Sequence, residues 1–142
     1  MKNIYALLLL CFAVGANAQT PFERVYTVLN TKCQNSTCHS ANSADVLKFD
    51  GDIDAVYNAI YEVPAQNASS VAKHEKLVKA GHPYMSYLLR KVAGSGFDTD
   101  LAIEATEGDL MKDINGNTLE KAEVEFIRQW TMYGAKRNYT GS

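Results

Sequence analysis

Apolar residues recur at the spacing of a helix in four stretches of the chain, and no stretch alternates apolar and polar residues over the length of a useful strand. The four stretches are 20–33, 52–63, 81–93 and 119–133. Irregular segments rich in turn-forming residues separate them. The pattern predicts an all-α domain of about four helices that are joined by long irregular loops.

The first predicted helix leads directly into a cysteine. Thr20 is followed three residues later by Glu23, which is the Thr-x-x-Glu signature of a capping box at a helix start. Apolar positions then form one stripe along the helix, and Cys33 is the last of them. We therefore expect a short amphipathic helix that ends at the Cys33 thiol.

Local signals also mark the other helices. Asp52 is a suitable N-cap for the second helix, and Pro64 is expected to stop it before a small polar loop. In the third helix, the pattern places Arg90 and Lys91 on the outer face. Gly134 suits the left-handed residue that ends the last helix.

The N-terminus has the features of a signal peptide. A single cation, Lys2, precedes an apolar run over 4–14, and Ala16-Asn17-Ala18 is a small-x-small sequence of the kind that a signal peptidase cuts after. The apolar run is too short to span a bilayer about 30 Å thick as a helix. We therefore expect residues 1–18 to be cleaved and the protein to be periplasmic or extracellular.

The remaining sequence suits one small domain. We expect the domain to cover 19–135 and to be followed by a loose C-terminal tail at 136–142. The formal net charge is −2 at pH 7, and Lys and Arg do not gather into a patch that would suggest nucleic acid. No later segment is apolar enough to cross a membrane. We expect a monomer or a weak oligomer.

The two cysteines that follow the predicted cleavage site lie in one short motif, Cys33-x-x-x-x-Cys38-His39. A disulfide between the cysteines would close a very small loop, would stabilise little, and would not call for the adjacent histidine. Zinc would find three ligands here, but His74 and His82 do not follow at finger-like spacing. Covalent haem attachment uses all three residues: two thioether links and an axial imidazole. The motif favours haem, although its spacer has four residues where two are usual.

The order of short motifs resembles that of small bacterial cytochrome c domains. The pieces are Val28-Leu29-Asn30-Thr31-Lys32-Cys33, Cys38-His39, Gly81-His82-Pro83, Ser86-Tyr87-Leu88-Leu89, and Ile127-Arg128-Gln129-Trp130 with Gly134-Ala135. The resemblance covers about residues 22–135, and four-residue spacers between the thiols occur in this group. It implies a cytochrome c-like fold around one haem c, an electron carrier rather than an enzyme, and redox proteins as partners.

The resemblance also implies a sixth iron ligand. In such domains a methionine on the loop before the last helix is usual, and Met111 occupies that place, although the proline that commonly follows it is absent. A thioether ligand raises the reduction potential relative to an imidazole. The other reading of Met111 is a core residue that fills a gap. His74 and His82 are the alternative ligands.

Two other functions remain open at this stage. An open or displaceable sixth position would suit a five-coordinate haem sensor or a small peroxidase-like protein. A Cys33–Cys38 disulfide would instead suit a haem-free binding module. The identity of the axial ligands and the presence of covalent haem separate these readings from electron transfer.

Overall fold

The computed structural model describes residues 19–34, 39 and 47–138. The predicted signal peptide at 1–18, Cys38, and the end of the predicted tail at 139–142 lie outside the described residues. The α-helices are α1 (Pro21–Val28), α2 (Ile53–Ile60), α3 (Ala68–Ala72), α4 (Tyr87–Ala93) and α5 (Lys121–Met132). The shorter helical turns are η1 (Leu29–Cys33), η2 (Pro83–Met85), η3 (Thr99–Leu101) and η4 (Ala105–Glu107). Between these helices the described residues form isolated β-bridges and no strand, so the all-α prediction is confirmed.

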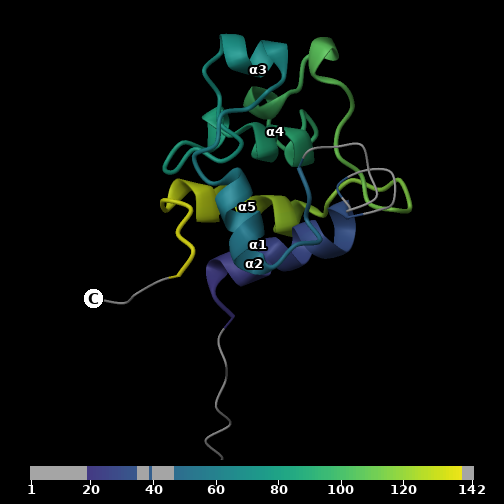
Figure 1. The fold of residues 1–142 in the computed structure, drawn as a ribbon. Helices are drawn as coiled ribbons and strands as arrows, with labels where there is room; N and C mark the ends of the chain where they lie inside the picture. Colours follow the sequence, from purple (N-terminus) through teal and green to yellow (C-terminus); the bar gives the residue numbers. More distant parts are fainter. Residues whose placement is uncertain (1–18, 35–38, 40–46, 139–142) are drawn as a thin grey trace, which may run out of the picture.

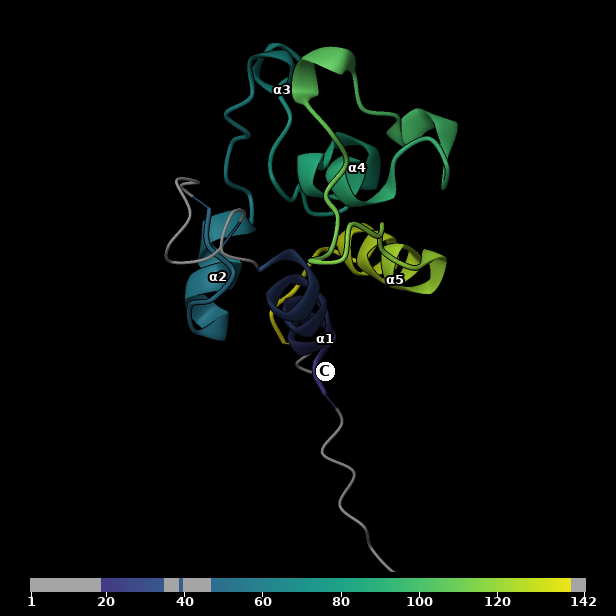
Figure 2. The same ribbon diagram turned by 90° about the vertical axis from the view of Figure 1, so that its right-hand side faces the viewer.

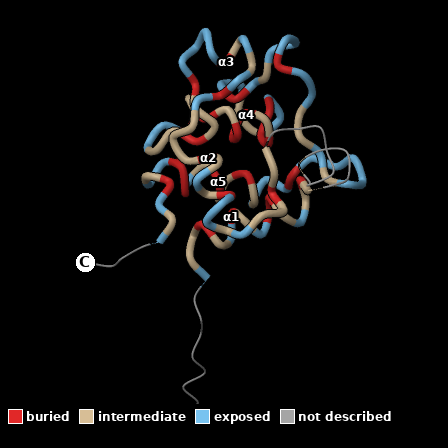
Figure 3. The backbone as a smooth tube through the Cα atoms, in the orientation of Figure 1, coloured by how far each residue is buried: buried red, intermediate tan, exposed pale blue. Residues whose placement is uncertain are grey.

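The helices are arranged around α1 and α5. α1 packs against both α2 and α5, and α5 packs in turn against α4 (Figures 1 and 2). The largest fully buried side chains include Phe22, Leu29, Phe49, Ile60, Leu89, Leu101 and Ile127. Figure 3 shows the buried residues running through the interior where these helices meet, while the α3 end is largely exposed. The core thus joins the first, middle and last helices of the chain.

The start of the first helix follows the sequence prediction. The Thr20 hydroxyl accepts a hydrogen bond from the Glu23 N–H at 3.2 Å, and the Glu23 carboxylate accepts one from the Thr20 N–H at 2.6 Å. α1 continues without interruption into the π-helical turn η1, which ends at Cys33. π-turns inside helices are frequent at functional sites, and this one widens the last turn before the cysteine.

The predicted helix count and the end of the second helix are corrected. Asp52 caps α2 as expected, with its carboxylate accepting from two backbone N–H groups, but α2 ends at Ile60, well before Pro64. The cause is Glu62, whose φ is +58° and whose N–H donates to the carbonyl of Val78 at 2.8 Å. The loop predicted after Pro64 contains the additional short helix α3, which Asn67 caps.

The third predicted helix begins later than expected, because Ser86 interrupts it. Ser86 has extended backbone angles and forms a parallel bridge with Lys76. Its buried hydroxyl accepts from the Lys79 N–H at 2.9 Å and donates to the His82 carbonyl at 3.0 Å. The segment predicted as one helix is therefore the turn η2 followed by α4, which starts at Tyr87.

The prediction that Arg90 and Lys91 face outward is wrong. Arg90 is only 4% exposed, and Lys91 is half-buried. Both side chains lie against the segment that precedes α5, where they meet carboxylate and carbonyl oxygens. α4 is therefore covered on both faces. Gly134 has the predicted left-handed conformation, with φ of +95°.

No helix in the described ranges combines the length and apolar character that crossing a bilayer requires.

Acid is expected to weaken the fold in part through an ion pair on α5. Arg128 donates to both carboxylate oxygens of Glu125, at 2.8 and 2.7 Å. These bonds, with one from Gln129, lower the pKa of Glu125 to about 2 from an ordinary value of 4.5. A lowered folded pKa means that the stabilisation is complete above pH 4.5 and is lost as the pH falls towards 2.

Replacing Glu125 by Gln should therefore reduce the free energy of unfolding at neutral pH by up to about 1 kcal/mol, since water reaches both partly exposed side chains and screens the pair. The two proteins should converge in stability as the pH approaches 2. Urea unfolding at several pH values measures the difference in stability at neutral pH and its decrease in acid. A constant difference between the proteins across the acid range would show that the Glu125 charge is not the cause.

Candidate functional site

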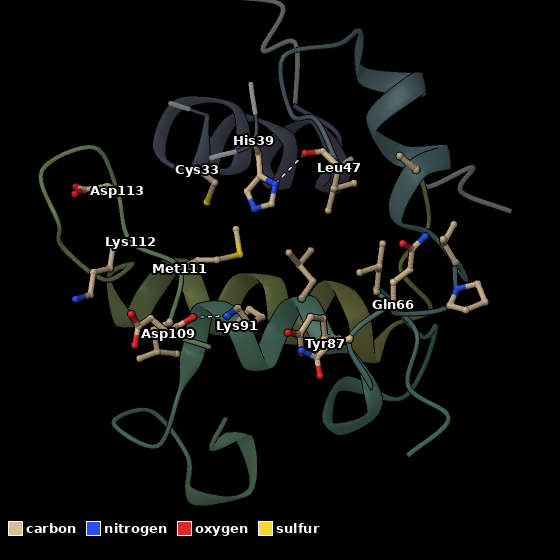
Figure 4. Close-up of a pocket in the computed structure, with 17 residues that line it drawn as sticks. Cys33, His39, Leu47, Gln66, Tyr87, Lys91, Asp109, Met111, Lys112 and Asp113 are labelled. Atoms are coloured by element: carbon tan, nitrogen blue, oxygen red, sulfur yellow. Dashed lines mark hydrogen bonds between the residues drawn. The ribbon is translucent and has the colours of Figure 1, made fainter. Parts of the chain in front are cut away.

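A cavity of about 760 Å³ opens between the start of the domain and the segment before α5. Its apolar wall consists of Leu47, Ala59, Val63, Leu77, Leu88 and Leu110, and its polar lining includes Gln66, Asn67, Tyr87, Lys91 and Asp109. The size lies within the range of about 300–1,000 Å³ that is typical of ligand and cofactor sites. Figure 4 shows Cys33, His39 and Met111 around one part of this space.

His39 is held by two residues that follow it in the chain, Leu47 and Phe49. Its Nδ1 lies 2.9 Å from the carbonyl oxygen of Leu47. Because a carbonyl only accepts, Nδ1 must carry the proton, and the basic lone pair is then on Nε2. The ring also packs on Phe49, with centroids 4.7 Å apart, and the Phe49 N–H donates to the His39 carbonyl at 2.8 Å. These contacts set the tautomer and the orientation that a metal-binding histidine needs.

Cys33 reaches the cavity from the end of η1. Its side chain is buried in the core cluster and lines the same space as His39. Figure 4 shows its sulfur turned towards the cavity. Cys38, the second predicted attachment residue, lies outside the described residues.

Met111 comes from the opposite wall. Its backbone N–H donates to the carbonyl of Lys91 in α4 at 2.8 Å. In Figure 4 its side chain rises towards His39, so the thioether and the imidazole face one another across the cavity. The structure therefore brings Cys33, His39 and Met111 to one space, although Met111 is far from the other two in the sequence.

The two alternative histidine ligands lie elsewhere. His74 and His82 are both exposed, and neither lines this cavity. His82 lies at a separate, smaller cavity of about 280 Å³ together with Arg128 and Met132. Within the described ranges, no three His, Cys, Asp or Glu side chains gather in a way that could hold a metal ion by themselves.

α4 supplies a polar group of side chains behind the Met111 segment. Tyr87, Arg90 and Lys91 share one face of the helix and contact the segment around Glu107. Burial raises the pKa of Tyr87, and the nearby Glu107 charge acts in the same direction. Burial lowers the pKa of Lys91, while Asp109 and Glu107 oppose this change.

Beneath this group is a buried cluster of charges. Arg90 pairs with Glu75 at 2.6 Å and with Glu107, and all three residues are at most 6% exposed. Glu107 also accepts from the Glu104 N–H at 2.7 Å and from the Ser70 hydroxyl at 3.4 Å. The cluster ties α4 to η4 and to the loop after α3.

Sequence reasoning missed the contributions of Lys91 and of the cavity wall between α2 and α3. Lys91 lies in a short helix whose apolar period marks the position as solvent-facing, and its partners are carbonyl oxygens, which no residue type reveals. Gln66 and Asn67 stand in a segment with no helical period. The carboxylates that would indicate a buried cation lie near it in space but are distant from it in the sequence.

No family model, curated protein or solved structure matches this chain.

Proposed function

We propose that this chain is a monohaem c-type cytochrome that carries single electrons between redox partner proteins. The observation that carries the proposal is the cavity in which the Cys33 thiol, the His39 imidazole and the Met111 thioether meet. An imidazole and a thioether on opposite walls suit the two axial ligands of a six-coordinate haem iron, and the buried thiol beside them suits covalent attachment of the porphyrin. The cavity volume and its apolar wall suit a porphyrin ring.

Different residues of the chain would hold the porphyrin and the iron of the haem. The thiols of Cys33 and Cys38 would hold the haem covalently, each through a thioether bond to one of its vinyl groups. His39 would bind the iron through Nε2, while the Leu47 carbonyl holds Nδ1. Met111 would supply its thioether sulfur as the second ligand, from the opposite wall of the cavity. The bound haem supplies one-electron chemistry by alternating between ferrous and ferric iron.

The finer fold, the location and the partners belong to the same proposal. The helices and the cavity would form a cytochrome c-like fold closed around the haem. The sequence at 1–18 suits export, so we place the mature protein in the periplasm or outside the cell. Redox partners would dock weakly at the exposed haem edge, over an interface below about 1,200 Å².

The deciding experiment is expression of the full chain together with a cytochrome c maturation system. Absorption spectra of the reduced and oxidised protein, a haem stain after denaturing electrophoresis, and the intact mass should all be measured. A sharp reduced α-band, haem that stays on the denatured chain and a mass increase of one haem would support the proposal. A colourless protein at the polypeptide mass would refute it.

Met111 can be tested separately in the same protein. Replacing Met111 by Leu removes the thioether without removing either thiol or His39. We expect the weak sulfur-to-iron band of the oxidised protein to disappear and the midpoint potential to fall by on the order of 0.1 V, a fraction of the ~0.8 V that axial ligands control. An unchanged oxidised spectrum and potential would favour an open-site haem sensor or peroxidase-like protein.

A further inference from the structure

The segment that carries Met111 is fastened to α4 through its backbone. The Met111 N–H donates to the Lys91 carbonyl at 2.8 Å. In the opposite direction, the Lys91 ammonium donates to the carbonyl of Glu107 at 3.1 Å and to the carbonyl of Asp109. One residue of α4 therefore bonds the segment at three backbone positions, two of which come shortly before Met111.

Packing on α4 fixes the same segment from the other side. The Leu110 side chain lies directly over Gly94, where an added Cβ would come within 2.7 Å of Leu110 Cδ1. Gly94 also has φ of +62°, which suits glycine and strains other residues. The close approach of Leu110 places the neighbouring Met111 against the end of α4.

The start of the segment is anchored by charge. Arg90 pairs with the buried Glu107 carboxylate, and the Tyr87 hydroxyl donates to the Glu107 carbonyl at 3.3 Å. With this end fixed by Arg90 and Tyr87, the Lys91 bonds act on the short stretch that remains before Met111. The conformation of that stretch determines the position of the Met111 thioether in the cavity.

From this geometry we propose that Lys91 is the positioning residue for the sixth iron ligand. Its ammonium group holds the carbonyls of Glu107 and Asp109 and thereby keeps the Met111 sulfur opposite His39. The inference rests on the proposed haem function and names the group that regulates access to the iron. Without the Lys91 bonds, Met111 spends more time away from the iron and small exogenous ligands enter more easily.

Imidazole is the probe for this role, because it must displace Met111 to bind the iron. Lys91→Leu removes the hydrogen bonds of the ammonium group and retains an apolar side chain, while Lys91→Arg retains a charged donor. Lys112→Leu is the matched control, because Lys112 is also a lysine beside Met111 at the cavity but is exposed. The carbonyls of Glu107 and Asp109 accept their hydrogen bonds from Lys91. Spectroscopic titration of the ferric holoprotein gives the apparent imidazole affinity.

We expect Lys91→Leu to bind imidazole about tenfold more tightly than the wild type, the factor that one hydrogen bond from a charged donor is worth. Lys112→Leu should be unchanged, and Lys91→Arg should lie close to the wild type. In the Met111→Leu background, the Lys91 substitution should have no further effect. An effect that persists there, or equal effects of the two lysines, would overturn the proposal.

Hydrogen exchange separates this inference from the haem proposal. In the same preparations, the Met111 amide should exchange about tenfold faster in Lys91→Leu than in Lys112→Leu, since its backbone bond is less well held. If the preparations contain no haem, the proposed function fails while the exchange rates still decide whether Lys91 holds the segment. Equal exchange rates would refute the role of Lys91.

Discussion

Replacing Cys33 and Cys38 together by alanine is expected to abolish covalent haem completely. The haem stain after denaturing electrophoresis should fall from full intensity to none, and the intact mass should match the bare polypeptide. The physical reason is that thioether bonds survive denaturation, whereas the proposed iron bonds of His39 and Met111 would not. Cys33 lies at the end of η1 and is buried, so its loss removes a proposed attachment point for which no other described residue offers a thiol.

Matched variants separate attachment from ligation. Met111→Leu should keep the haem on the denatured chain while it loses the sulfur-to-iron band, and a single Cys33→Ala variant should keep one link through Cys38. If the double variant still stained for haem, the attachment site would lie elsewhere. If the wild type carried no haem and its intact mass were two hydrogens below that of its reduced polypeptide, a disulfide module would be the better description.

The local features of the fold were predictable because their causes are local. The capping box of Thr20 and Glu23, the Asp52 cap and the left-handed Gly134 each depend on residues within a few positions of one another. The apolar stripe of the first helix likewise leads to Cys33 as expected, although the π-turn η1 at its end was not foreseen. Short-range chemistry determined these elements.

The failures share a long-range cause. α2 ends early because Glu62 bonds to Val78, and the helix expected from 81 is interrupted because Ser86 pairs with Lys76. In both places a segment distant along the chain offers hydrogen bonds that compete with helix continuation. A helical period reveals which face is apolar, but it carries no information on such partners.

The candidate site divides in the same way. The motif around Cys33 and His39 is contiguous, so the sequence alone identified it. Met111 was identified only through the resemblance to cytochrome c domains, because its distance from the motif in sequence gives no sign that the two meet. The helical period places Arg90 and Lys91 on the solvent side, and only the position of Glu107 in space shows why Arg90 is buried and Lys91 half-buried.

The burial of Arg90 leads to the largest expected effect on stability. Arg90 is the cation between two carboxylates, Glu75 and Glu107, and the three residues are nearly inaccessible. Within the described residues, Arg90 Nε and one oxygen of Glu75 make no hydrogen bond, so the cluster is already incompletely satisfied. Removing the guanidinium would leave two carboxylates buried at close range, with the exposed Lys73 ammonium still 3.7 Å from Glu107, and this is far more costly than losing a partly exposed pair.

Arg90→Leu should therefore lower the free energy of unfolding by about 3–5 kcal/mol. Arg128→Leu, which breaks the partly exposed pair with Glu125, should cost less than about 1 kcal/mol. Urea unfolding of both variants gives the comparison, and if Arg90→Leu is too unstable to purify, Arg90→Lys serves as the milder form. Adding Glu75→Gln and Glu107→Gln should recover part of the loss, because the uncompensated charges disappear with them. Equal costs at Arg90 and Arg128, or no recovery on neutralising the carboxylates, would show that the destabilisation arises from packing and not from buried charge.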